Sequence, residues 1–265
     1  MRVILGNILA IYRKELQSYF ASPFAYVIAG VFWLLSGVFF AILLFSPSGL
    51  IAQIALRDQM GVTEPVDVAY EFLNAYLGVL GSLSLFLLPM LSMGLYAEER
   101  KRGTLELLAT SPITNWAVAL GKLLGVLTFF ITMVLPLLVY EAIALSAADP
   151  PLQPTIMLLG HAGLILLAAG VLSLGMFVSS LTDSTILAAI LTFTLILFLW
   201  IIEAIAGGLS GWVGEAVGHL SLLKHYTDLI QGTINTSGLV LFASYILLGL
   251  FLTAQSIETF RFQRS

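Results

Sequence analysis

Cysteine is absent from this chain of 265 residues, and charged residues make up only 10% of it. Without cysteine, the chain holds no disulfide, thiol nucleophile or thiolate metal site. Soluble domains are about 25% charged and about 45–50% apolar. This chain is 59% hydrophobic, with a mean hydropathy of +1.02. A chain of this composition has too few charged residues to cover a surface that faces water on all sides. The composition therefore indicates a protein embedded in a bilayer.

Two enzyme motifs are also missing. The chain has no G-x-x-x-x-G-K-[ST], because Gly121-Lys122 lacks the earlier glycine at the required spacing and is followed by Leu123. It has no H-E-x-x-H, which excludes a zinc protease of that type. We therefore expect no ATP hydrolysis by this chain alone, no metal site and no cofactor bound within it.

Six apolar stretches are long enough to cross a bilayer, for which about 20 residues are needed. They are Phe24–Phe45, Tyr76–Ala97, Val118–Leu145, Ile156–Leu181, Thr185–Ile205 and Gly238–Ile257. The runs are continuous rather than alternating, which favours helices over a barrel. The sequence predicts an all-α polytopic membrane protein with six transmembrane helices in a single domain, residues 1–265.

Lysine and arginine fall almost entirely on one side of this arrangement. With the N-terminus inside, nine of the 11 cations lie in inner segments: Arg2, Arg13, Lys14, Arg100, Lys101, Arg102, Lys122, Arg261 and Arg264. Only Arg57 and Lys224 lie outside. This positive-inside bias predicts that both termini are cytoplasmic.

Residues 1–22 precede the first span and show an amphipathic helical pattern. At about 100° per residue, the apolar side chains share one half of the helical wheel and Arg13, Lys14 and Gln17 the other, with Glu15 as the exception. The pattern is typical of a helix lying in the cytoplasmic interface. An ordinary helix packed on a neighbouring span is the alternative.

Two connections on the outer side are long. Residues 46–75 are polar enough for an external loop with a short helix. Residues 206–237 place several glycines among leucine, tryptophan and valine, so they are too apolar for a loop and too interrupted for a span. A re-entrant or interfacial hairpin is the better interpretation.

The densest run of charge lies between the second and third spans, in residues 98–112. It reads Glu-Glu-Arg-Lys-Arg-Gly-Thr-Leu-Glu-Leu-Leu-Ala-Thr-Ser-Pro. On a helix, Glu98 faces Arg102 one turn later, and Pro112 ends the helix. We expect a short amphipathic helix on the cytoplasmic face. Two roles fit it on physical grounds: it transmits a push from a soluble partner, or its cations only anchor the chain to anionic lipid.

This string, followed by Gly121-Lys122, resembles the signature of type 2 ATP-binding-cassette (ABC) transporter permeases. The opening residues Lys14-Glu15-Leu16, Tyr19-Phe20, Ser22-Pro23 and Ala25-Tyr26-Val27 are similar to the branch of that family associated with gliding motility. The resemblance covers nearly the whole chain, from the interfacial helix through the outer hairpin to the last span.

The resemblance implies the membrane-spanning permease subunit of an ABC exporter in a bacterial plasma (inner) membrane. ATP and Mg would belong to a separate cytoplasmic ABC ATPase, and a second permease copy or paralogue would complete the transporter. The motility branch typically has a further membrane partner with a large extracytoplasmic domain. No nucleic acid is implied.

In that family the charged loop forms a coupling helix that contacts the ATPase. The resemblance therefore assigns docking and hinge roles to Glu98, Glu99, Arg100, Gly103, Thr104 and Glu106. Their charges would pair across the interface, and Gly103 would allow close backbone approach.

Ionisable residues inside predicted spans are candidates for function. Glu141 lies near the outer end of the third span, Glu203 at the outer end of the fifth and His161 near the outer end of the fourth. Glu141 and Glu203 are candidates for a translocation path from the outer leaflet. Equally, all three lie near enough to the interface for their side chains to reach water.

Two other functions compete with the permease. Gly208-Leu209-Ser210-Gly211 matches the string of rhomboid proteases, with His219 and His225 following. Rhomboids place the serine and histidine on different spans, whereas here both lie in one outer segment. A secondary transporter would be favoured by midplane carboxylates and paired repeats, and neither is evident.

Overall fold

The computed structural model describes residues 2–61, 66–105, 113–148, 152–208 and 211–262, and within them every regular element is a helix. The helices are α1 (Arg2–Ala21), α2 (Pro23–Phe45), α3 (Leu50–Gln59), α4 (Val68–Ser92), α5 (Gly94–Lys101), α7 (Asn115–Leu145), α8 (Pro154–Leu181), α9 (Thr185–Gly208), α10 (Trp212–Gly218), α11 (Leu222–Ile230) and α12 (Thr236–Phe262).

Six of these helices, α2, α4, α7, α8, α9 and α12, are long and apolar enough to cross a membrane. The predicted all-α polytopic fold with six spans is therefore confirmed. The second span begins earlier than expected, at Val68 rather than Tyr76. Asp67 explains this start, because its carboxylate caps the helix by accepting a hydrogen bond from Tyr70 N at 3.0 Å.

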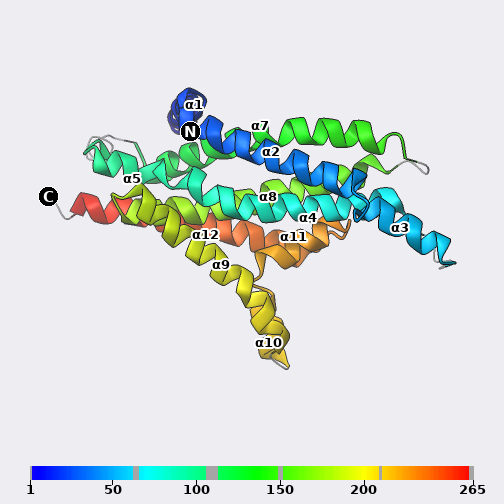
Figure 1. Cartoon of the computed structure of the whole chain (residues 1–265). Helices are drawn as coiled ribbons and strands as arrows, with labels where there is room; N and C mark the ends of the chain where they lie inside the picture. The colour runs from blue at the N-terminus through cyan, green and yellow to red at the C-terminus, as the bar shows by residue number, and fades with distance from the viewer. Residues whose placement is uncertain (1, 62–65, 106–112, 149–151, 209–210, 263–265) are drawn as a thin grey trace.

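The long helices form one bundle with α8 at its centre (Figure 1). Helix α8 packs against α4, α7, α9, α11 and α12 and is the most buried of the six. Its contact with α12 is very close, since a Cβ on Gly249 would lie 2.6 Å from the backbone of Ser173. Small residues at such contacts let membrane helices approach closely where lipid supplies no hydrophobic driving force.

Helix α1 lies across the direction of the long helices, toward the end of the bundle that carries α5 (Figure 1). It packs on α7 at two glycines one turn apart. A Cβ on Gly121 would lie 2.9 Å from Ile11, and one on Gly125 would lie 2.7 Å from Glu15. Apolar side chains elsewhere on α1, including Val3 and Leu5, stay exposed. Helix α1 thus packs on a span and still presents an apolar surface of the kind expected at the interface.

The described part of residues 206–237 holds the end of α9, then α10, α11 and the start of α12. Helix α10 packs on α9 and projects away from the bundle, while α11 turns back against α8 and α4 (Figure 1). Tyr226 of α11 is buried and donates a hydrogen bond to Leu77 O at 2.5 Å. The segment is therefore neither an extended loop nor a seventh span. The short helix expected in residues 46–75 is α3.

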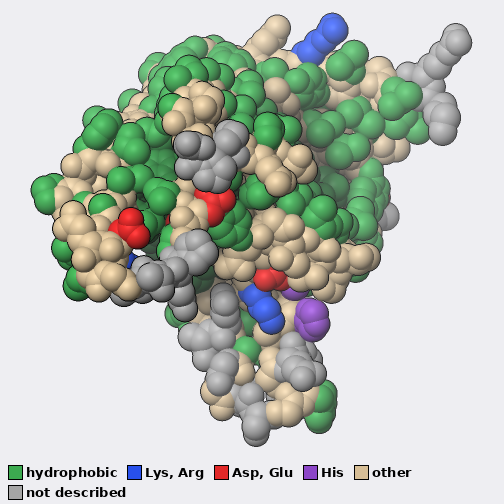
Figure 2. Space-filling view, turned by 90° about the vertical axis from the view of Figure 1, so that its right-hand side faces the viewer, with side chains coloured by type: hydrophobic (Ala, Val, Ile, Leu, Met, Phe, Trp, Pro, Cys, Tyr) green, Lys and Arg blue, Asp and Glu red, His purple; other side chains and the backbone are tan. Residues whose placement is uncertain are grey.

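The end of the bundle opposite α5 is the one that carries α3 (Figure 1). Figure 2 looks onto this end and shows hydrophobic side chains among backbone and other uncharged side chains, with separate acidic, basic and histidine side chains. The run of charged residues 98–102 lies on α5 and its C-cap, at the other end of the bundle.

Candidate functional site

Helix α5 is separated from α4 by a break that follows a proline. Pro89 has no N–H to donate within α4, and the helix ends at Ser92. The first N–H groups of α5 consequently lack partners within their own helix. Ser179 of α8 supplies the missing acceptor. Its hydroxyl accepts hydrogen bonds from Tyr96 N at 3.1 Å and from Ala97 N at 3.0 Å, and it donates one to Met93 O at 2.7 Å. One side chain of the central helix thus holds the α4–α5 joint.

The other end of α5 is closed by Gly103. Its φ of +71° lies in the left-handed region, which favours glycine. Gly103 N donates to Arg100 O at 3.1 Å, and Thr104 N donates to Glu99 O at 2.9 Å, which is the Schellman pattern. A Cβ on Gly103 would meet nothing within 4 Å among the described residues. Within this chain, glycine is thus required by the backbone turn. The predicted close approach of a partner's backbone stays a prediction.

A buried ion-pair cluster joins α5 to α1 and α7. Lys122 of α7 is 2% exposed, and its ammonium lies 3.2 Å from Glu15 Oε2, 3.0 Å from Glu99 Oε1 and 2.7 Å from Leu95 O. Lys14 adds a second, exposed cation 3.2 Å from Glu99 Oε1. Two carboxylates and two ammonium groups balance, so the buried charges are compensated. We call Lys14, Glu15, Glu99 and Lys122 the Lys122 cluster.

Sequence reasoning missed this cluster, although one signal of it was present. Glu15 was the single charge on the apolar half of the α1 wheel, and its position is now explained by Lys122. In the sequence, Lys122 is an inner cation and part of the Gly121-Lys122 pair of the family resemblance, and neither observation indicates a partner for it. Glu15, Lys122 and Glu99 are far apart in sequence, so no local pattern links them.

Tyr19 provides another link between α1 and α4. Its hydroxyl donates to Leu91 O at 2.5 Å. Burial raises the pKa of Tyr19 well above its ordinary value, and the nearby Glu15 and Glu98 carboxylates raise it further. The phenol therefore stays protonated and keeps its donor role over the physiological pH range.

The remaining predicted site residues lie around α5. Glu98 pairs with Arg102 at 3.4 Å, as its spacing predicted, and both side chains are largely exposed. Arg100 donates to Ser180 O at 3.1 Å, which adds a second tie between α5 and α8. The Thr104 hydroxyl donates to Glu99 O at 3.2 Å. Glu106 and the rest of 106–112 lie outside the described residues.

The candidates for a translocation path are placed differently. Glu141 is fully buried, and its Oε1 lies 3.4 Å from His161 Nε2. His161 Nδ1 lies 2.9 Å from Met157 O, and because a carbonyl can only accept, Nδ1 carries a hydrogen. The structure thus brings together Glu141 and His161, two residues singled out separately. Glu203 lies in α9, but its side chain is outside the described part, so no shared site with Glu141 is shown.

The described residues hold no group of three histidine, aspartate or glutamate side chains that would bind a metal. His225 Nε2 lies 3.2 Å from His219 O, and the two imidazole rings stack. Ser210, the nucleophile of the protease hypothesis, lies outside the described residues.

The fold and site together define a polytopic helical membrane protein whose charged end is tied by hydrogen bonds and ion pairs to its central helices. Residues 63–254 match the family described as ABC-2 family transporter protein. This match spans more than half of the chain, and the chain belongs to that family. It is therefore a membrane-embedded permease component of an ABC transporter, a class that works with a cytoplasmic ABC ATPase. No curated protein matches the chain.

Proposed function

We propose that the chain is the permease subunit of an ABC exporter. We also propose that residues 98–112 contact the ATPase and are displaced when the ATPase changes conformation. Both termini and α5 would then face the cytoplasm, as the distribution of lysine and arginine predicts. A second permease copy or paralogue would complete the translocation path. The family match begins at residue 63, so the resemblance of the N-terminal residues to the motility branch stays a prediction.

The observation that carries this proposal is the double attachment of α5. Ser179 and the Arg100–Ser180 bond tie it to α8, and the Lys122 cluster ties it to α1 and α7. A displacement of α5 would therefore be passed to two spans and to α1, rather than being absorbed by a loose loop. A mere lipid anchor needs no such attachment. The family assignment likewise favours the permease over the secondary transporter and the serine protease.

The exposed side chains of α5 offer the test. Glu99 is paired within the chain, so reversing its charge would disrupt the Lys122 cluster as well as any docking. Lys101 and Arg102 are better suited, because both are exposed and the pair that Arg102 forms with Glu98 lies at the surface. In mild detergent, we expect an ABC ATPase to co-purify with the wild-type chain and to be lost from the double variant Lys101→Glu/Arg102→Glu.

The matched control is Arg57→Glu on α3, an exposed cation in the segment expected outside. It should retain the ATPase. Equal capture by all three proteins would refute docking at this end, and absence of an ATPase from the wild type would count against the partnership itself. A reporter fused after Ser265 should be cytoplasmic and one inserted near Glu64 external; the reverse pattern would overturn the orientation.

A further inference from the structure

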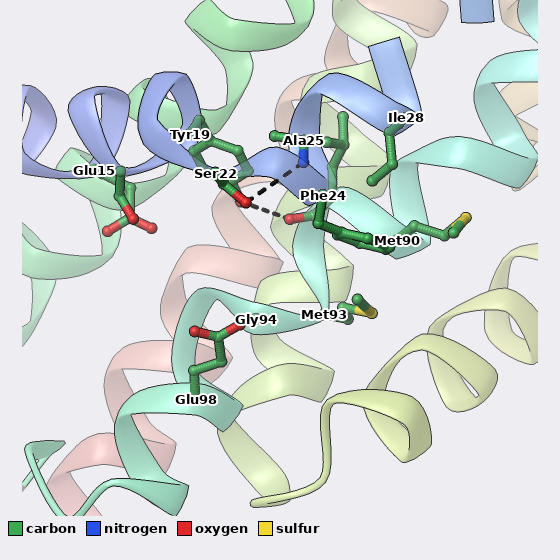
Figure 3. A pocket seen from close by; sticks show the side chains of 12 residues that line it. Glu15, Tyr19, Ser22, Phe24, Ala25, Ile28, Met90, Met93, Gly94 and Glu98 are labelled. Atoms are coloured by element: carbon green, nitrogen blue, oxygen red, sulfur yellow. Dashed lines mark hydrogen bonds between the residues drawn. The ribbon is translucent and has the colours of Figure 1, made fainter. Parts of the chain in front are cut away.

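A cavity of about 110 Å³ lies where α1, α2, α4 and α5 meet (Figure 3). Its polar end is formed by Glu15 and Glu98, and Phe24 and Met90 lie at its other end (Figure 3). Among the described residues that line it, none is a lysine or an arginine. The cavity is therefore acidic at one end and apolar at the other.

Each of the two carboxylates uses only one of its oxygens in an ion pair within the described residues. Glu15 uses Oε2 for Lys122, and Glu98 uses Oε2 for Arg102. In the part of the chain that the structure describes, neither Oε1 atom accepts a hydrogen bond. Glu98 Oε1 lies over Gly94 in the cavity wall, since a Cβ on Gly94 would be 3.2 Å from it. Glu98 thus places an unused acceptor in the cavity wall, and Glu15 is a second carboxylate residue that lines the same space.

The apolar end opens at the membrane boundary. Phe24 is the second residue of α2, and Met90 lies two residues before the end of α4. Both side chains are partly exposed, at 43% and 38%. A chain leaving the cavity past Phe24 and Met90 would run along the surface of two spans, where lipid tails lie.

From these features we infer that the cavity binds a primary ammonium group carried on an apolar chain. An ammonium has three donors and no acceptor, which suits a space lined by the acceptor-bearing residues Glu15, Glu98 and Ser18. Its bonds to the carboxylates are charge-assisted and stronger than neutral ones. A quaternary ammonium has no N–H to donate, and an anionic head group would meet two carboxylates and no lysine or arginine among the described lining residues.

This chemistry has two sources, an aminophospholipid of the bilayer or a free alkylammonium amphiphile. The inference does not depend on the ATPase, because it uses only contacts within this chain. The test is therefore made on the purified chain alone, in uncharged detergent, with tritiated dodecylamine as the probe. Failure of ATPase capture would leave the binding result unaffected, and the reverse is also true.

We expect saturable binding of one dodecylammonium per chain. Glu98→Gln removes one charged acceptor and should weaken the affinity by about tenfold or more. Gly94→Ala places a methyl group against Glu98 Oε1 and should also weaken it. Glu98 is exposed and Gly94 lies in a helix, so both variants should fold. Asp58→Asn, an exposed carboxylate on α3, is the control and should bind as the wild type does.

Competing lipids identify the source. Displacement by phosphatidylethanolamine, but not by phosphatidylcholine or phosphatidylglycerol, assigns the site to an aminophospholipid. Glu98-dependent binding that phosphatidylethanolamine leaves in place assigns it to a free amphiphile. Non-saturable binding, or equal affinity in wild type, Glu98→Gln and Gly94→Ala, overturns the inference.

Discussion

The ammonium of Lys122 on α7 lies 3.0 Å from the Glu99 carboxylate on α5, inside the end of the helix bundle. Glu99 follows the second predicted span and Lys122 begins the third, so the contact closes the loop between them at its base. Glu15 from α1 completes the contact. The charged loop is thus held at its base by a largely buried ion pair between Lys122 and Glu99.

Removing Lys122 should be strongly destabilising. In Lys122→Met, the buried Glu15 and Glu99 carboxylates lose their shared cation, and breaking a buried ion pair costs about 3–5 kcal/mol of the free energy of unfolding. The four tryptophans make intrinsic fluorescence during heating a suitable measurement. Lys14→Met is the control, because its exposed pair contributes about 0–1 kcal/mol. Equal losses in the two variants would contradict a special role for Lys122.

The sequence was sufficient for the spans and for the Glu98–Arg102 pair, but not for the end of the charged helix. Pro112 was expected to end it, whereas α5 ends at Lys101 and is closed by Gly103. Continuous apolar runs gave six helices, and the i,i+4 spacing gave the Glu98–Arg102 pair. The contacts that hold α5 depend on distant residues. Ser179 reads as an ordinary serine in an apolar span, and nothing local indicates that its hydroxyl satisfies another helix. The pairing of Glu141 with His161 likewise needs the packing of α7 on α8.

Ser179 should control the mobility of the α4–α5 joint. In Ser179→Ala, Tyr96 N and Ala97 N lose their acceptor, and an unsatisfied buried group costs about 1–3 kcal/mol. We expect faster hydrogen exchange at these two amides. Ser180→Ala is the matched control, because among the described residues the Ser180 hydroxyl donates only to Phe177 O of its own helix. Similar exchange in both variants would show that the joint is held by other contacts.

The close packing of α1 on α7 should depend on Gly125. In Gly125→Val, the branched side chain meets Glu15 and the α1 backbone, which backbone shifts of α1 must relieve. Amides of α1 should then exchange faster, since they lose protection by packing. Gly30→Val on α2 is the control, because it adds the same side chain at a position where a Cβ would have no described atom within 4 Å. Unchanged exchange in α1 of the Gly125 variant would mean that the contact tolerates separation.

The Glu141–His161 pair should show strong coupling between its two members. Either single change, Glu141→Leu or His161→Leu, leaves the other polar side chain buried without its partner. Replacing both by leucine removes both unsatisfied groups, and such replacements of buried pairs are often neutral. We therefore expect the double variant to unfold at a higher temperature than the His161→Leu single variant, with an interaction energy of about 0.5–3 kcal/mol in the double-mutant cycle. Additive losses would instead show that Glu141 and His161 act independently. Transport measured on the stable double variant would then separate a packing role from a role in the translocation path, because only the latter predicts lost transport in a folded protein.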